Sequence, residues 1–68
     1  MALSARNHLK GDITEVILGP VTALITVKVG DNIVESVITK RSAEEMGLRK
    51  GDKVTAVIKA TEVMIQKG

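Results

Sequence analysis

Hydrogen-bond donors gather near both ends of this sequence. Residues 4–7 read Ser-Ala-Arg-Asn and place a hydroxyl, a guanidinium, an amide and backbone N–H groups within four positions. Near the other end, Lys59 lies among apolar residues in the run Val-Ile-Lys-Ala at 57–60. An ammonium group is rarely buried without a partner, so Lys59 either extends to solvent or faces a bound anion. A set of guanidinium, ammonium, hydroxyl and amide donors is what holds a tetrahedral oxyanion.

Signatures of catalysis or metal binding are weak in comparison. His8 is the only imidazole and has no Cys or Ser at the spacing of a nucleophile relay. Cysteine is absent, which excludes disulfides, thiol catalysis and thiolate zinc sites. The six glycines are scattered singly rather than gathered in a phosphate-binding loop, and the carboxylates do not cluster. We therefore expect no catalytic residue and no metal ligand, and a binding protein rather than an enzyme.

The composition narrows the range of partners. Phe, Tyr and Trp are absent, which excludes the stacking of aromatic side chains on nucleic-acid bases. The formal net charge is +2, too near balance to indicate nucleic acid or a membrane surface by itself. No apolar run approaches the roughly 20 residues of a membrane span, and no signal peptide is visible at the start. The resulting expectation is a cytoplasmic protein without nucleic-acid or membrane partners.

The length of 68 residues indicates one small domain, 1–68, with a thin core. A chain of this size buries only about 60% of the surface that it exposes when unfolded. Disulfides cannot compensate, and without Phe or Trp the core must consist of Val, Ile, Leu, Ala and Met side chains. Self-association is the natural way to bury the remaining apolar surface, so the sequence predicts a homo-oligomer.

Alternation of apolar and polar residues predicts two strands in the first half of the chain. The first runs from 9 to 17 and places Leu9, Ile13 and Ile17 on one face. A Gly-Pro pair at 19–20 then breaks the chain. The second strand, 21–29, carries apolar residues at every odd position, which form one of its faces.

Two further extended runs are predicted after the second strand. A Gly-Asp-Asn sequence at 30–32 is typical of a hairpin and leads into a β-branched run at 33–39. The last run, 53–65, carries apolar residues on both faces, which indicates that it is covered on both sides. A break near Ala60 would divide this run into a fourth and a fifth strand.

The helix signal is confined to the segment between the third and fourth strands. The Ser42 hydroxyl can accept the amide of Glu45, and Glu45 can reach back, as in a capping box. Gly47 fits the residue that ends such a helix after one to two turns. The order of elements predicts an all-β fold, an OB-like five-stranded barrel with one short helix between strands three and four.

Five segments, taken in order along nearly the whole chain, carry a resemblance to a known family. They are Ser-Ala-Arg-Asn at 4–7, Leu-Lys-Gly at 9–11, Val-Ile-Thr at 37–39, Gly-Asp-Lys-Val at 51–54, and the run 57–65. In this combination the sequence resembles the molbindin (Mop) family, small cytoplasmic proteins that bind molybdate and tungstate. The opening Ser-Ala-Arg-Asn and the closing Ile-Lys-Ala-Thr are the most specific parts of the match.

The resemblance implies a single Mop domain with an OB-like fold and a hexamer built as a trimer of dimers. It further implies oxyanions held at subunit interfaces by residues from more than one chain. Related domains occur inside transport ATPases and molybdate-responsive regulators, and 68 residues leave no room for those additional parts. The implied role is therefore the storage or homeostasis of molybdenum as its oxyanion.

Carried over residue by residue, the resemblance implies six oxyanion ligands and two further candidates. The six are the hydroxyls of Ser4 and Thr39, the charges of Arg6 and Lys59, and the backbone amides of Ala5 and Ala60. The further candidates are Asn7, which could instead brace the loop, and Ser42, which is equally explained as a helix cap. His8 stands where the family often carries another polar residue, and its role is open.

Two other classes of function remain open on the sequence alone. The segment 46–54, Met-Gly-Leu-Arg-Lys-Gly-Asp-Lys-Val, also resembles swapped-hairpin, AbrB-like DNA-binding transcription regulators, whose basic residues contact phosphates. The basic residues available for such contacts are Lys40, Arg41, Arg49, Lys50 and Lys53. This pattern does not account for residues 4–7. The third class is a purely structural assembly module whose anion sites are vestigial.

Overall fold

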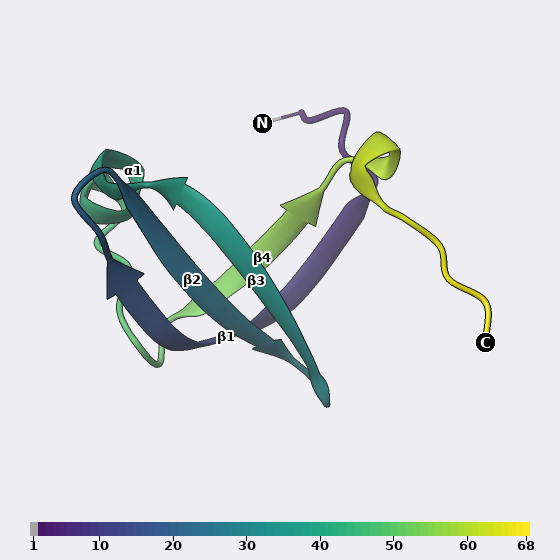
Figure 1. The fold of residues 1–68 in the computed structure, drawn as a ribbon, viewed down its shortest axis with the longest axis horizontal. Helices are drawn as coiled ribbons and strands as arrows, with labels where there is room; N and C mark the ends of the chain where they lie inside the picture. Colours follow the sequence, from purple (N-terminus) through teal and green to yellow (C-terminus); the bar gives the residue numbers. More distant parts are fainter. Residues whose placement is uncertain (1) are drawn as a thin grey trace.

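The computed structural model of the protein describes residues 2–68, which form one sheet, one α-helix and one 3-10 helix. The elements are β1 (Asn7–Leu18), β2 (Thr22–Val29), β3 (Asn32–Thr39), α1 (Lys40–Glu45), β4 (Lys53–Ile58) and η1 (Ala60–Glu62). The sheet is antiparallel in the order β3-β2-β1-β4, and it curls into a half-barrel (Figure 1). This arrangement confirms the predicted all-β class, the hairpin between β2 and β3, and the helix between the third and fourth strands.

The curl of the sheet originates in β1, which changes its partner strand along its length. From Asp12 to Leu18 it pairs with β2, and from Asn7 to Asp12 it pairs with β4. Gly11 lies at the changeover, where a Cβ atom would be 2.8 Å from Val27 Cγ1 and in direct collision with the backbone oxygen of Lys28. The absence of a side chain at Gly11 therefore allows β1 to cross β2 closely enough for the sheet to fold over.

The core lies on the concave side of this curled sheet. Its buried residues are Ile13, Ala23, Ile25, Val27 and Ala43. The β2 side chains among them belong to the odd-numbered face predicted from the sequence, and Ala43 brings α1 against them. A hollow of about 400 Å³ remains inside the curl, lined by side chains that include Val34 of β3 and Ile58 of β4. The thin core expected for a chain of this size is thus observed.

The predicted face of β1 is wrong beyond Ile13. The register with β2 shifts between Ile13 and Glu15, so that one extra residue lies in β1. Such a bulge moves every following side chain to the opposite face of the strand. Val16 consequently packs against the core, whereas Ile17 is 49% exposed on the convex side.

A fifth strand is not seen among residues 2–68, where four strands are described. The β1–β4 ladder ends at the pair Asn7–Ile58, and the chain then turns through η1, in which the Glu62 N–H donates to the Lys59 carbonyl at 2.9 Å. The predicted last part of the 53–65 run is therefore extended but unpaired. Met64 is 93% exposed and Ile65 is 90% exposed. The apolar character that predicted a covered strand is present, but a partner strand is not.

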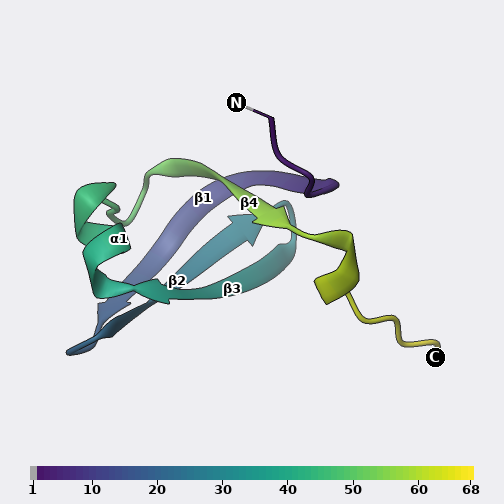
Figure 2. The same cartoon turned by 90° about the horizontal axis from the view of Figure 1, so that it is seen from above.

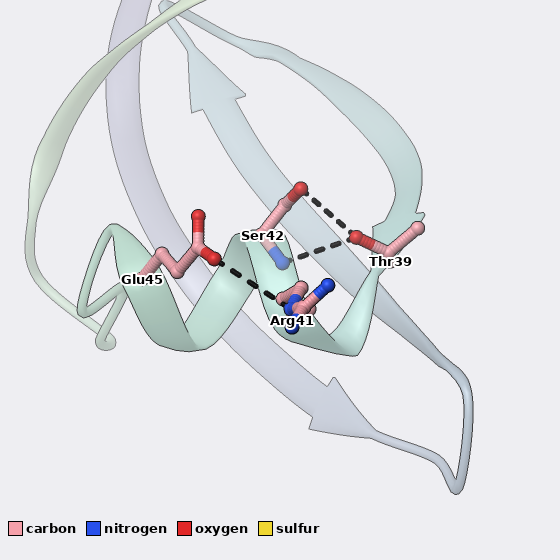
Figure 3. Close-up of polar contacts among 4 residues, drawn as sticks. All are labelled: Thr39, Arg41, Ser42 and Glu45. Atoms are coloured by element: carbon pink, nitrogen blue, oxygen red, sulfur yellow. Dashed lines mark hydrogen bonds and ion pairs between the residues drawn. The ribbon is translucent and has the colours of Figure 1, made fainter.

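The predicted capping box is wrong by one turn, because the helix begins directly after β3. Thr39 occupies the N-cap position, and its Oγ1 accepts the backbone N–H of Ser42 at 3.0 Å (Figure 3). Glu45 lies near Arg41, at 3.7 Å, rather than reaching back to the start of the helix. At the other end, Gly47 follows the C-cap with a positive φ of 60°, as the sequence predicts.

Removal of the Thr39 hydroxyl is expected to destabilise the protein. Thr39→Val keeps the shape of the side chain but leaves the Ser42 N–H without its acceptor, and loss of an N-cap costs about 1 kcal/mol. Urea denaturation followed by circular dichroism measures the change. The matched control is Thr22→Val, which alters the residue paired with Thr39 across the β2–β3 ladder. Equal midpoints for the two variants would contradict the capping role.

Candidate functional site

The two charged candidate ligands, Arg6 and Lys59, lie beside each other just past the end of the β1–β4 ladder. The β1–β4 ladder ends at Asn7 and Ile58, so that Arg6 and Lys59 each lie one residue beyond the last pair. The Asn7 side chain donates from Nδ2 to the Ile58 carbonyl at 3.1 Å and ties the two segments together. Asn7 thus makes the contact expected of a residue that braces the loop.

We call this part of the molecule the cation end, formed by Ser4, Ala5, Arg6, Lys59 and Ala60. Arg6, Lys59 and Ala60 are exposed, and Lys59 immediately precedes η1. The N–H groups at the start of such a turn have no acceptor within it, so that of Ala60 is free to donate elsewhere. A guanidinium, an ammonium and an amide donor therefore come together on two adjacent segments.

His8 orients the backbone of the cation end. Its Nε2 lies 3.1 Å from the carbonyl oxygen of Ala5, within hydrogen-bond distance. In a trans peptide the carbonyl and the following N–H point in opposite directions. The contact therefore turns an acceptor, the Ala5 oxygen, towards the imidazole and leaves the Arg6 N–H on the opposite side. The sequence left the role of His8 open, and the structure supplies this contact.

The remaining candidate ligands, Thr39 and Ser42, form what we call the hydroxyl end. Thr39 Oγ1 donates to Ser42 Oγ at 2.9 Å while it accepts the Ser42 N–H at 3.0 Å. The hydroxyl proton of Thr39 is therefore already used, whereas that of Ser42 remains available to a ligand. Figure 3 shows both hydroxyls at the start of α1. In this arrangement Ser42 is the better placed donor of the two.

The cation end and the hydroxyl end lie at opposite ends of the molecule. Asn7 begins β1 beside the cation end, whereas Leu18 ends it next to the Thr22–Thr39 pair. The 12 residues of β1 run between them, in a molecule that measures 35 Å along its longest axis. Figures 1 and 2 both show α1 at one end of the molecule and the yellow-green turn η1 at the other. Because hydrogen bonds span about 3 Å, one chain cannot direct both ends at the same small anion.

Other chemistry finds little support in the part of the chain that the structure describes. There, no group of three or more His, Cys, Asp or Glu side chains is placed to hold a metal ion. Among the same residues, no helix is long and apolar enough to cross a membrane. No charged or polar residue between Ala2 and Gly68 is classed as buried. The donors of both ends are therefore open to an incoming ligand or to a second protein surface.

Two features of the site were missed by sequence reasoning. The first is the cap at Thr39, for which the available signal was Thr39 itself, a residue type that suits an N-cap, at the end of the β-branched run 33–39. The second is the separation of the two ends, which follows from strand order. Strand order depends on pairing between distant segments and leaves no local mark in the sequence.

Comparisons with known proteins agree with this fold and identify its family. The TOBE domain family matches residues 3–65. Molybdenum-pterin-binding protein 3 of Clostridium pasteurianum is 46% identical over 66 residues, which cover 96% of this chain and 97% of that protein. Among solved structures, a molybdate-binding protein from Sporomusa ovata superimposes with a TM-score of 0.95 at 37% identity, covering 98% of this chain and 100% of the other.

A third comparison includes the ligand. The cytoplasmic molybdate-binding protein ModG, in a structure with molybdate bound, matches with a TM-score of 0.83 and 38% identity, over 88% of this chain and 43% of that chain. The match to residues 3–65 and the identities of 37–46% confirm the resemblance inferred from the sequence. The protein therefore belongs to the TOBE domain family, and its relatives there are the molybdenum-pterin-binding, or Mop, proteins.

Proposed function

We propose that this protein binds molybdate and tungstate between copies of itself, as a cytoplasmic, non-enzymatic protein for molybdenum storage or homeostasis. The observation that carries the proposal is the division of the donors between two distant ends of the chain. A complete donor shell then requires the cation end of one copy and the hydroxyl end of another. The names of the relatives support molybdate as the anion.

The proposed ligands divide between two copies. One copy supplies Ser4, Ala5, Arg6, Lys59 and Ala60, and the other supplies Ser42 with Thr39 behind it. Hydroxyls, amides, a guanidinium and an ammonium can all donate, and an ionised tetrahedral oxyanion accepts at every oxygen. Asn7 and His8 hold the backbone of the cation end through their contacts with Ile58 and Ala5.

A site made only of donors selects among oxyanions by protonation. Molybdate and tungstate carry no proton at neutral pH, whereas hydrogen phosphate carries one that needs an acceptor. An unpaired buried donor costs about 1–3 kcal/mol, which disfavours phosphate. Sulfate is also free of protons but is smaller, so that the size of the cavity must exclude it. Molybdate and tungstate are nearly equal in size, and we expect the site to bind both with similar affinity.

The distribution of apolar side chains supports association of several copies. Only five residues between Ala2 and Gly68 form the buried core, whereas many large apolar side chains are exposed. The most exposed of these include Leu3, Val21, Val37, Met64 and Ile65. We propose a homo-oligomer, with a hexamer made of three dimers as its form, in which a fifth strand completes the barrel when the chain after η1 finds a partner. The single-domain organisation over 1–68 is part of this proposal.

The DNA-binding alternative has less support than anion binding. Two of its five proposed phosphate contacts already have acidic neighbours, since Lys53 Nζ lies 3.1 Å from Asp12 Oδ1 and Arg41 Nε lies 3.7 Å from Glu45 Oε1. These exposed pairs are weak, but they reduce the positive potential that a phosphate backbone would need. A low-salt gel shift with duplex DNA is expected to show no complex at micromolar protein.

Native mass spectrometry with and without molybdate tests the proposed function directly. We expect an oligomer whose mass increases in whole steps of one molybdate. The number of bound anions should be smaller than the number of basic residues in the oligomer. Calorimetry should then give similar affinities for molybdate and tungstate and a far weaker one for phosphate. A monomer that binds no molybdate at micromolar concentration would contradict the proposal. Equal affinity for phosphate would show that the site contains an acceptor or lies open to water.

A further inference from the structure

The imidazole of His8 uses one ring nitrogen in its contact with Ala5 and leaves the other unassigned. A carbonyl oxygen can only accept, so Nε2, 3.1 Å from the Ala5 oxygen, carries the hydrogen of the neutral ring. The basic lone pair of that ring is therefore at Nδ1, and His8 is exposed to water. We propose that Nδ1 takes up a proton from solvent when the oxyanion binds, so that affinity for the anion rises as the pH falls.

His8 lies on the same face of the chain as the two charged candidate ligands. Exposure alternates over residues 5–8, of which Arg6 and His8 are the exposed members. His8 pairs with Val57 across the ladder, and Lys59 follows two residues later with an extended backbone, φ −68° and ψ 137°. Alternate residues of an extended chain share a face. The inference rests on the proposed function, in which Arg6 and Lys59 hold the anion.

The contact with Ala5 allows the charge of the ring to change without a change in geometry. Both the neutral ring and the imidazolium donate from Nε2, because the added proton joins the lone pair of Nδ1. The Ala5 oxygen thus keeps its donor, and the Arg6 N–H keeps its direction. Protonation of His8 therefore adds a positive charge to the cation end and leaves the arrangement of its backbone as it is.

The other side chains around His8 leave it as the group that responds to pH. On residues 4–10, on residues 55–59 and in η1, the charged side chains are Arg6, Lys10, Lys59 and Glu62. The two residues that β4 places nearest to His8 in the ladder, Val57 and Ala56, are uncharged. Among these side-chain types, only imidazole ordinarily changes its charge between pH 5 and 8.

The size of the coupling follows from the charge of the ligand. An opposite charge favours the charged form of a titratable group, and molybdate is a dianion at neutral pH. Two residues of strand span about 6.6 Å, which places His8 on the order of 10 Å from an anion held by Arg6. At that distance in water, one added positive charge corresponds to about a threefold gain in affinity at low salt. Binding of the anion favours the proton by the same factor.

Proton NMR tests the proposal on the unaltered protein, because His8 is the only residue with an aromatic ring. In heavy water, after exchange of the amides, the two carbon-bound protons of this ring are the signals expected in the aromatic region. When sodium molybdate is added at pH 7, we expect both signals to move towards the positions that they take in acid. Unmoved signals, with molybdate bound by calorimetry, would overturn the proposal and leave the proposed function intact. Absence of molybdate binding would contradict both.

Calorimetry at pH 6 and at pH 8, at low salt, provides the second test. The wild type should bind molybdate about threefold more tightly at pH 6 than at pH 8. His8→Gln keeps an N–H that can reach the Ala5 oxygen but has no basic nitrogen, so the ratio of the two affinities should fall to about one. Lys10→Gln is the matched control, since it removes an exposed charge from β1 and leaves the imidazole, and it should retain the ratio. A retained ratio in His8→Gln, or a lost ratio in both variants, would overturn the assignment to His8.

Discussion

The Gly11→Ala variant should lose most of the free energy of unfolding that the wild type has at 25 °C. The added methyl group would collide with the backbone oxygen of Lys28 and would lie 2.8 Å from Val27 Cγ1 and 2.9 Å from Val29 Cγ2. Overpacking of this kind costs about 1–3 kcal/mol and occasionally more. The upper part of that range applies here, because the oxygen belongs to a paired strand and cannot move aside. A core of this size supplies only about 3–5 kcal/mol in total.

Far-ultraviolet circular dichroism and urea denaturation measure this effect. Gly68→Ala is the control, since nothing lies within 4 Å of a methyl group added there. A Gly11→Ala variant with the wild-type urea midpoint would show that β1 and β2 can separate at the changeover without loss of the fold. Such a result would also show that the curl of the sheet does not depend on the missing side chain at Gly11.

Lys59→Ala and Arg6→Ala should each weaken molybdate binding about tenfold or more. Hydrogen bonds to charged groups contribute roughly 1.5–3 kcal/mol, and about 1.4 kcal/mol corresponds to a factor of ten in affinity. Without ligand, two neighbouring cations repel each other, so either substitution should leave the stability of the empty protein unchanged or raise it. Molybdate should raise the melting temperature of the wild type by mass action, and this rise should be smaller in both variants.

Lys67→Ala is the matched control for these two substitutions, because Lys67 is exposed on the segment after η1. It should retain the full rise in melting temperature with molybdate. If Lys59→Ala also retains it, Lys59 extends to solvent and is not a ligand. The fold and the family would stand in that case, but the assignment of the cation end would not.

Mixing of variants extends this prediction to the composition of the site. Lys59→Ala retains an intact hydroxyl end, and Ser42→Ala retains an intact cation end. When the two variants are unfolded together and refolded, mixed oligomers contain some interfaces in which both ends are wild type. Molybdate binding should recover in the mixture to a fraction of the wild-type capacity. No recovery would mean that the ligands of each anion come from one chain.

The elements that depend on neighbouring residues could be predicted from the sequence. Gly30 and Asp31 form the hairpin between β2 and β3, and Gly47 ends α1, because turn and cap chemistry acts over a few residues. The alternation that predicts the buried face of β2 is equally local. The predicted cap failed at Ser42 for a related reason. Ser42 and Thr39 both suit a cap, and the length of β3 decides between them.

Features that depend on distant pairing could not be predicted. The bulge after Ile13 adjusts β1 to β2, and nothing in the local alternation of apolar residues marks it. The segment after η1 has the composition of a strand but lacks a partner among residues 2–68. For the candidate site, the family resemblance named individual ligands such as Arg6 and Ser42. It did not indicate that a strand of 12 residues separates them within one chain.

The placement of the two ends also bears on the symmetry of the assembly. Contact between a cation end and a hydroxyl end joins unlike surfaces, so a pair of copies closes only when the exchange is reciprocal about a two-fold axis and creates two identical sites. Without that axis, a row of copies always has one free cation end and one free hydroxyl end. Such a row stops growing only when the rotation between successive copies closes it into a ring. An anion shared by two copies also couples the two equilibria: association raises the affinity for the anion by the same factor by which the anion strengthens association. Dilution of the protein would then release molybdate even at a constant concentration of free anion.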